Sequence, residues 1–588
     1  MKLSGKSASA KSDSCTPLVW ASTFLLSCFV LWFIWFGGVI STAVVLEWEF
    51  FSACGFSLSV LLLLDFLGAL FSFVVCLISG CVFIFSVSYM SGDKFHSLFY
   101  SLVAAFVAAM NILILIPNLV FVLLGWDLLG IISFLLVVYY QNSVSVGAGM
   151  LTVLMNRIGD VFLVLAIGFS SSAGIWGILE VEQLAGQVVW VGVLLVGAGM
   201  TKSAQIPFSV WLPAAMAAPT PVSALVYSST LVTVGVYFLF RHYHVLMCVN
   251  GLLPLLSKVG CLTLLMASLG ACLELDIKKL VALSTLSHLG FMVYVLGVGY
   301  PVLSVFHLLS HALFKSLLFL CAGHYMHEVG CSQDIRQMSG VGWGSSPLVM
   351  ACIIIGLNSL CGVPYLSGFY SKDAILEGSM TSFVGALEIL CLVVGAGASC
   401  LHAMRLLLYS IFGPLGGLPL VGESGVSGFV AFPVLLLALG SICFSYVMQQ
   451  AWAEASLSFS LSFLAKVGLF LALNLGVVIL ATSVLGFGYS GGSLYGGFSS
   501  RLMAVKLFLS SMWFFRWWSF AVPGVWFSCG SLTVSAMEMG WMEVIGGRGV
   551  GGSFVGLGSK LWVMEGISVL NMLRLAGGVL LVLGVHYF

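Results

Sequence analysis

The stretch WVGVLLVGAGMTKSAQIPFSVWLP, residues 190–213, decides the fold class of this chain. Its first half is almost entirely apolar, as a membrane-spanning helix requires, yet Lys202 follows directly and Pro207 and Pro213 come soon after. A lysine at the centre of a bilayer costs about 2.5 to 3.5 kcal/mol on insertion scales, so a lysine at that depth points to function. Proline removes a backbone hydrogen-bond donor. We therefore predict a helix that is interrupted beside a functional, buried lysine.

The rest of the chain has the composition of a membrane protein. Of 588 residues, 61% are hydrophobic and 7% are charged, and the mean hydropathy is +1.16. Apolar runs of more than about 18 residues recur along the chain, which predicts a polytopic α-helical fold. Strands of a membrane barrel would alternate polar and apolar residues instead. Lys and Arg together number 21, as do Asp and Glu, so nothing predicts a nucleic-acid partner.

We predict about fifteen spans at some twenty residues each. In chain order they are 17–45, 57–89, 96–116, 118–140, 147–171, 188–206, 220–240, 252–273, 278–299, 302–325, 347–369, 381–411, 427–447, 463–485 and 569–587. Lysines at 2, 6 and 11 favour an N-terminus on the negative side of the membrane. With fifteen spans, the C-terminus would lie on the other side.

A second apolar run carries a polar stripe. His307, His311 and Lys315 are four residues apart in HLLSHALFK, which places them on one helical face. Two such histidines can bind zinc, but Leu308 stands where a zinc protease has its glutamate. Histidine titrates near neutral pH, so we predict a proton relay. A polar seam between helices is the structural alternative.

Two carboxylates and an arginine also fall in apolar surroundings. Asp160 follows Arg157 at a spacing of three, so the two side chains can neutralise one another. Asp127 has no nearby partner in the sequence, and we predict that Lys202, on another helix, supplies its counter-charge.

A third lysine, Lys372, follows the helix-breaking segment GVPYLSG, residues 362–368, and is itself followed by Asp373. Paired interrupted helices in two halves of a chain indicate a transporter's ion site. Snorkelling of Lys372 at a helix end is the alternative. His288, another polar residue in an apolar run, is a further candidate for the relay. The sixteen cysteines have no metal or disulfide spacing, so they are interpreted as small core residues.

At these residues the chain resembles the antiporter-like membrane subunits of respiratory complex I. The resemblance covers about residues 60–415, and its motifs are LGW at 124–126, NRIGD at 156–160, TKSAQ at 201–205, WLP at 211–213, PTPVSAL at 219–225, DIKK at 276–279, HALFK at 311–315 and GFYSKD at 368–373. It implies two inverted five-helix repeats, each with a broken helix, and proton movement across the inner mitochondrial membrane during NADH oxidation.

The resemblance also implies roles by position. Lys202 matches the proton-carrying lysine of the first half, Asp127 its carboxylate partner, and Lys372 the terminal lysine. His311 and Lys315 match the central connection between the two halves. The chain departs from the family twice: Asp127 replaces a frequent glutamate, and Tyr227 stands where histidine is usual. Tyrosine is a poor proton acceptor at neutral pH, so we do not expect Tyr227 to carry charge.

The domain organisation that follows has six parts. They are N-terminal helices at 1–95, a first repeat at 96–250, a second repeat at 251–415, additional helices at 416–499, a lateral amphipathic helix at 500–565 and a final span at 566–588. Glycines at 546, 547, 549, 551 and 552 would interrupt the lateral helix.

The resemblance implies that other membrane-arm subunits are partners, contacted partly through the lateral helix, together with lipid, water and protons. NADH, FMN, iron-sulfur clusters and ubiquinone would belong to other subunits, because the sequence has neither a nucleotide-binding loop nor a cysteine cluster. Two alternatives remain. One is a subunit of a multisubunit cation/proton antiporter or a membrane-bound hydrogenase, and the other is a membrane scaffold without transport.

Overall fold

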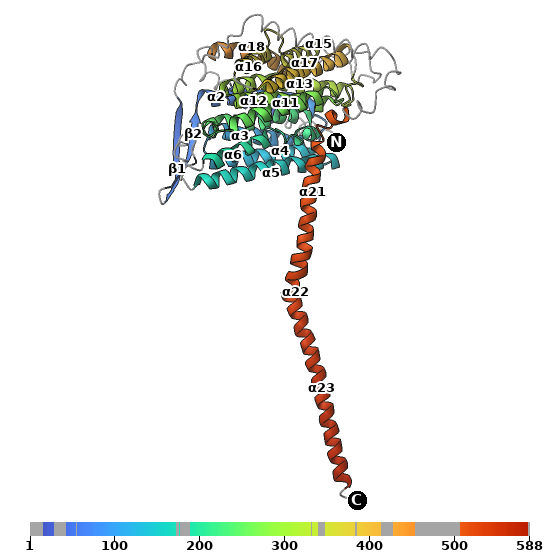
Figure 1. Ribbon diagram of the computed structural model, residues 1–588. Coiled ribbons are helices and arrows are strands. Elements are labelled where there is room, and N and C mark those ends of the chain that lie inside the picture. The colour runs from blue at the N-terminus through green and yellow to red at the C-terminus, as the bar shows by residue number, and fades with distance from the viewer. Residues whose placement is uncertain are drawn as a thin grey trace. The chain divides into compact units, whose positions relative to one another are not determined.

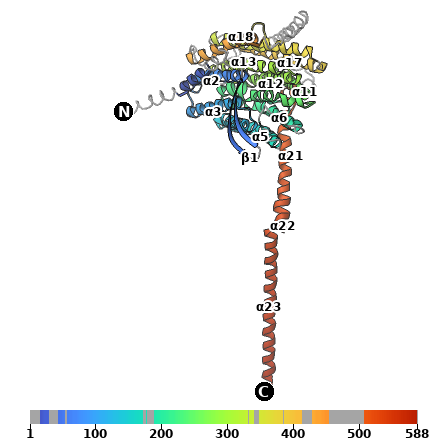
Figure 2. The same ribbon diagram turned by 90° about the vertical axis from the view of Figure 1, so that its left-hand side faces the viewer.

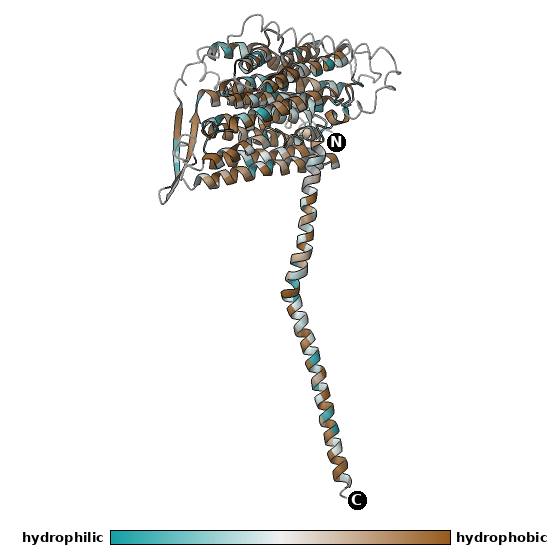
Figure 3. Ribbon diagram, viewed as in Figure 1, coloured by the Kyte–Doolittle hydropathy of each residue, from teal (hydrophilic) through white to brown (hydrophobic). Residues whose placement is uncertain are grey.

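The computed structural model describes residues 16–28, 43–53, 56–171, 176, 188–330, 332–338, 347–382, 385–412, 427–452 and 506–585. The chain forms two units, Met1–Phe515 and Arg516–Phe588. In the described part, eleven helices are long and apolar enough to cross a membrane. The fold is the predicted helical one, and Figure 3 shows how hydrophobic residues dominate the helices of the first unit. The predicted span 463–485 lies outside the described residues.

The first unit contains two successive sets of five spans, and the fourth span of each set is broken (Figure 1). The first set is α3 (His96–Leu115), α4 (Leu119–Val137), α5 (Ser143–Ser171), the broken pair α6 (Val188–Lys202) and α7 (Trp211–Ala214), and the continuous run of α8 (Thr220–Val222), the π-helix η4 (Ser223–Thr230) and α9 (Leu231–Arg241). The second set is α11 (Leu252–Ala271), α12 (Ile277–Val298), α13 (Pro301–Glu328), the broken pair α15 (Pro347–Cys361) and α16 (Ser367–Thr381), and α17 (Ala386–Leu407).

Residues 16–28 form a further apolar helix and residues 506–510 a short one. This unit also has other short and flanking elements. They are α2 (Phe66–Tyr89), the 3₁₀ turns η1 (Val138–Tyr140) and η3 (Ala215–Ala217), α10 (Tyr243–Cys248), the π-helix η5 (Leu408–Phe412) and α18 (Gly428–Trp452). Local sequence explains several boundaries. Asp65 caps α2 by accepting from the Gly68 amide at 3.0 Å, and Pro301 begins α13. Gly299, at φ +106°, ends α12.

One predicted helical segment is instead a hairpin. The span at 57–89 begins as strand β2 (Phe56–Leu64), which pairs antiparallel with β1 (Val44–Ala53), and becomes helical only at Phe66. The two figures agree that the hairpin lies across one end of the helices (Figures 1 and 2). Glu47 and Glu49 alternate with apolar residues in β1, which is the period of a strand. In the sequence, the high hydropathy of residues 44–64 made this alternation difficult to recognise.

Helices α11 and α12 pack together through glycines. A Cβ added at Gly290 would lie 2.8 Å from the backbone nitrogen of Leu264, and Gly260 and Gly297 similarly face the backbone of the opposite helix. Small residues of this kind let two membrane helices approach closely. This contact fixes the position of α12, which carries His288.

A buried ion pair joins the two ends of the first five-helix set and the helix before it. Arg241, the last residue of α9, donates to both carboxylate oxygens of Asp65, at 2.5 and 2.7 Å. Arg241 also donates to the Tyr237 hydroxyl at 2.7 Å, and that hydroxyl donates to the Ile114 carbonyl at 3.2 Å. These contacts tie α2, α3 and α9 together at one end.

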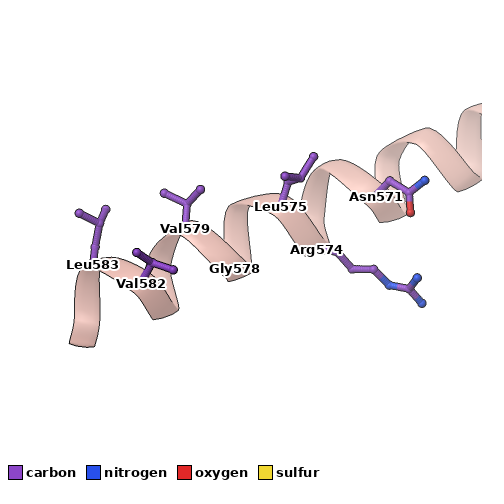
Figure 4. A pocket seen from close by; sticks show the side chains of 7 residues that line it. All are labelled: Asn571, Arg574, Leu575, Gly578, Val579, Val582 and Leu583. Carbon is purple, nitrogen blue, oxygen red and sulfur yellow. The ribbon is translucent and has the colours of Figure 1, made fainter. Parts of the chain in front are cut away.

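The second unit contains α21 (Phe515–Thr533), the π-helix η8 (Val534–Met542), α22 (Glu543–Ile545) and α23 (Gly547–Val585). The glycine cluster interrupts the helix, as predicted, but at one position only. The helical path breaks at Gly546, whereas Gly549, Gly551 and Gly552 lie inside α23. One face of α23 has Asn571 and Arg574 followed by apolar side chains up to Leu583 (Figure 4). The large apolar side chains of α23, such as Trp562 and Leu581, are exposed within this chain.

Candidate functional site

Lys202 lies at the predicted helix break and is fully buried. It is the last residue of α6, and residues 203–210 are not helical. The side chain of Trp211 donates to the Thr201 carbonyl at 3.1 Å, which satisfies one of the acceptors left open at the helix end. Gln205 accepts from Thr263 of α11 at 2.7 Å. The break is therefore held in place by Trp211, at the start of α7, and by Thr263 of α11 in the second five-helix set.

The Lys202 ammonium faces neutral groups of α4. Its Nζ donates to the Trp126 carbonyl at 3.2 Å and lies 5.0 Å from the centre of the Trp126 ring. The direct ion pair predicted between Lys202 and Asp127 is not among the salt bridges of the described residues. Neighbouring residues on an α-helix point about 100° apart. Because Trp126 faces the lysine, Asp127 is turned toward α5.

Arg157 on α5 is the counter-charge of both carboxylates. Its Nη1 lies 3.3 Å from Asp127 and 3.0 Å from Asp160. The Arg157 side chain is 49% exposed within this chain, whereas that of Asp160 is 13% exposed. Arg157 thus brings Asp127 and Asp160 together, and Asp160 is the less exposed of the two carboxylates.

A cavity of about 140 Å³ lies between α4 and α5 beside this group. Its polar lining comes from Asn156, Arg157 and Asp160, and its apolar lining includes Phe134. The side-chain oxygen of Asn156 is buried and has no hydrogen-bond partner among the described residues. At about 30 Å³ per water, the cavity has room for roughly four waters with polar partners.

The histidine stripe of α13 is buried, as predicted, and His288 of α12 joins it. His288 Nδ1 lies 3.1 Å from His307 Nε2, and His307 Nδ1 lies 2.9 Å from the Ser371 hydroxyl of α16. The rings of His288 and His311 are centred 5.3 Å apart. Both ring nitrogens of His311 are buried without a hydrogen-bond partner in the described part of the chain. Within those same residues, no group of three or more His, Cys, Asp or Glu has metal-binding geometry.

Lys315 and Lys372 both adjoin this histidine group. Lys315 is fully buried, and its Nζ donates to the Ser284 hydroxyl of α12 at 2.5 Å. Lys372 lies just beyond the second break, where Gly362 and Tyr365 have φ values of +85° and +69°. Its Nζ donates to the Ser399 hydroxyl at 2.8 Å and to the Cys361 carbonyl at 3.3 Å.

Asp373 is partly exposed on α16. As the neighbour of Lys372, it points to another side of that helix. Tyr227 is buried within the π-helix η4, and its hydroxyl has no hydrogen-bond partner among the described residues.

Sequence analysis did not single out the serines that connect these groups. Ser284, Ser371 and Ser399 each bind a lysine or a histidine. Serine is common in apolar helices, where its hydroxyl usually bonds to the preceding turn. Only the tertiary structure identifies the serines that contact a titratable group.

Buried lysines at the breaks of two five-helix sets define a membrane transport subunit of the antiporter type. Residues 117–399 match the family described as NADH:quinone oxidoreductase/Mrp antiporter. Residues 48–100 match the N-terminus of chain 5 of NADH-ubiquinone oxidoreductase (complex I), and residues 402–582 match the C-terminus of NADH dehydrogenase subunit 5.

Whole-chain comparisons agree with these matches. NADH-ubiquinone oxidoreductase chain 5 of Anopheles gambiae is 42% identical over 526 residues, which cover 86% of each chain. The Lumbricus terrestris protein of the same name is 43% identical over 72% of this chain and 74% of its own. The chain belongs to the NADH-ubiquinone oxidoreductase chain 5 family.

Solved structures show the same fold. A chain of the Mrp complex from Dietzia sp. aligns with a TM-score of 0.70 and 25% identity over 88% of this chain and 59% of its own. A chain of the archaeal membrane-bound sulfane sulfur reductase aligns with a TM-score of 0.65 and 20% identity over 76% of this chain and 94% of its own.

Proposed function

We propose that this chain is a proton-translocating membrane-arm subunit of NADH:ubiquinone oxidoreductase, complex I, in the mitochondrial inner membrane. The observation that carries the proposal is the chemistry around its three lysines. Lys202, Lys315 and Lys372 are each less than 4% exposed, and their ammonium groups donate to neutral oxygens. Burial destabilises the charged form of a lysine relative to the neutral form, which suits a group that gains and loses protons.

The proposed path runs through the two five-helix sets. Asp127, Arg157 and Asp160 set the charge near Lys202, and the cavity between α4 and α5 supplies water at this end. A second group of polar residues lies in the second five-helix set. Its donors and acceptors lie within hydrogen-bond distance or one helical turn of each other, and its members are Lys315, Ser284, His288, His307, Ser371 and Lys372. The ring nitrogens of His311, which have no hydrogen-bond partner among the described residues, lie beside this group and suit a bridging water.

In this assignment NADH, FMN, iron-sulfur clusters and ubiquinone bind to other subunits of the complex. The exposed apolar residues of α23 suit contact with lipid or with neighbouring membrane-arm subunits. The matches at residues 48–100 and 402–582, both specific to chain 5, favour complex I over a cation/proton antiporter or a hydrogenase.

Replacing Lys202 by methionine tests the proposal against a scaffold without transport. The complex carrying Lys202→Met is reconstituted in vesicles, and NADH-driven acidification is measured beside NADH oxidation. Lys258→Met is the matched control, because Lys258 is an exposed lysine on α11. We expect acidification to fall in Lys202→Met but not in Lys258→Met. Full acidification by an assembled Lys202→Met complex would reject the proposal.

A further inference from the structure

Cys361 and Cys400 form a pair beside Lys372. Cys361 ends α15 at the second break, and Cys400 lies in α17. The Cys400 thiol lies 3.4 Å from the Cys361 carbonyl, and the Cys361 thiol lies 4.0 Å from the Cys400 carbonyl. Two cysteines 39 positions apart therefore face one another in both directions.

The Lys372 ammonium contacts the cysteine pair at one backbone carbonyl and at a neighbouring serine hydroxyl. Lys372 donates to the Cys361 carbonyl and to the hydroxyl of Ser399, the residue that precedes Cys400. A covalent bond between the cysteines would fix the two acceptors of Lys372 relative to one another.

The two thiols differ in exposure. Cys361 is partly exposed at the break, whereas Cys400 is 6% exposed. A small oxidant can therefore reach Cys361 first, and Cys400 stands ready to react with it. Among the cysteines that the structure describes, these are the two whose thiols each approach the backbone carbonyl of the other.

We infer that Cys361 and Cys400 are a modification site, a dithiol that a hydroperoxide converts to a disulfide and that thereby holds Lys372 in place. The Cys361 sulfur attacks one peroxide oxygen, the O–O bond breaks, and a sulfenic acid and water form. The Cys400 sulfur then attacks the Cys361 sulfur, and the sulfenic oxygen leaves as water with the Cys400 proton. Overall, two thiols and one hydrogen peroxide give one disulfide and two waters.

The chemical part is tested on the intact complex in proteoliposomes. The complex is treated with hydrogen peroxide, free thiols are alkylated, and the digest is analysed by mass spectrometry without reduction. We expect a Cys361–Cys400 cross-linked peptide that dithiothreitol removes. If both residues are recovered as alkylated thiols while other cysteines are oxidised, the inference is overturned.

The effect on Lys372 is tested with variants, each compared with its own untreated activity. Peroxide should slow NADH-driven acidification of the unsubstituted complex, and dithiothreitol should restore it. This sensitivity should disappear in Cys361→Ser and in Cys400→Ser. It should remain in Cys352→Ser on α15 and Cys391→Ser on α17, which are matched controls on the same helices. Equal sensitivity in all four variants would overturn the inference.

This effect rests on the proposed function, and the two can fail separately. If the cross-link forms without slowing acidification while Lys202→Met abolishes it, the disulfide does not control Lys372. If neither change slows acidification, the proposed function fails as well, and the cross-linked peptide alone still establishes the modification site.

Discussion

Lys315 on α13 donates to the hydroxyl of Ser284 on α12 at 2.5 Å. Ser284 lies one helical turn before His288, which contacts His307 at 3.1 Å. Ser284, which carries no charge of its own, thus connects the buried Lys315 ammonium to the helix that carries one member of the His288–His307 pair.

Replacing Ser284 by alanine removes the acceptor that stabilises the Lys315 ammonium. A hydrogen bond to a charged group contributes about 1.5 to 3 kcal/mol, so the protonated lysine becomes roughly tenfold or more harder to form. We expect slower NADH-driven acidification with normal assembly. Ser287→Ala is the control, because that hydroxyl bonds to the Ser284 carbonyl of its own helix at 2.9 Å. Equal effects of the two substitutions would contradict the prediction.

Replacing Arg157 by alanine leaves Asp127 and Asp160 without their shared partner. The two carboxylates would then attract a proton or bind the Lys202 ammonium more tightly, and proton release at this lysine would slow. We expect reduced acidification and a smaller defect in Arg157→Lys, which keeps the charge. The Arg157 side chain is 49% exposed within this chain, so assembly should change little. An assembly defect without a defect in acidification would argue for a structural role instead.

We predict that the Tyr227 hydroxyl is not required for proton movement. Its hydroxyl has no hydrogen-bond partner in the described part of the chain, and its ring packs 6.3 Å from that of Trp211. Tyr227→Phe keeps the ring and removes only the hydroxyl. We expect acidification close to that of the unsubstituted complex. A loss as large as that of Lys202→Met would mean that this hydroxyl carries protons through water.

Replacing Gly290 by alanine tests the contact between α11 and α12. The added methyl group would meet Leu264 and Thr263 at 2.8 Å, so the helices must separate. Overpacking of this kind typically costs about 1 to 3 kcal/mol. We expect less assembled complex on a native gel and a lower melting temperature. Gly168→Ala is the control, because a Cβ at Gly168 meets nothing within 4 Å.

Removing one partner of the Asp65–Arg241 ion pair leaves a charge largely buried. The two side chains are 19% and 13% exposed. Breaking a buried pair typically costs about 3 to 5 kcal/mol. Asp65→Asn should therefore lower the melting temperature and the amount of assembled complex. Arg336→Gln, at an exposed pair with Asp334, is the control and should change neither.

The sequence predicted the elements that depend on long apolar periods and on proline or glycine. Both broken helices follow from Pro207, Pro213 and the segment at residues 362–368, and the stripe on α13 follows from its spacing of four. The hairpin at residues 44–64 was missed, because strand alternation is weak where most residues are apolar.

Pairing across helices could not be obtained from the sequence. The sequence predicted Asp127 as the partner of Lys202, because Asp160 already has Arg157 nearby in the sequence. The rotation of α4 could not be obtained from the sequence, and in the structure it turns Trp126 rather than Asp127 toward Lys202. The dithiol at Cys361 and Cys400 likewise depends on how α15 and α17 pack, because nothing in a spacing of 39 residues indicates contact.

The Arg241–Asp65 pair also bears on how the chain is made. Its partners are separated by 176 positions, and between them lie four of the five spans of the first set and most of the fifth. During synthesis, Asp65 enters the membrane long before Arg241 leaves the ribosome. The two charges can meet only after the intervening helices have been inserted. The pair can therefore form only once the first five-helix set is complete, and a product truncated within that set would leave the Asp65 carboxylate without this partner.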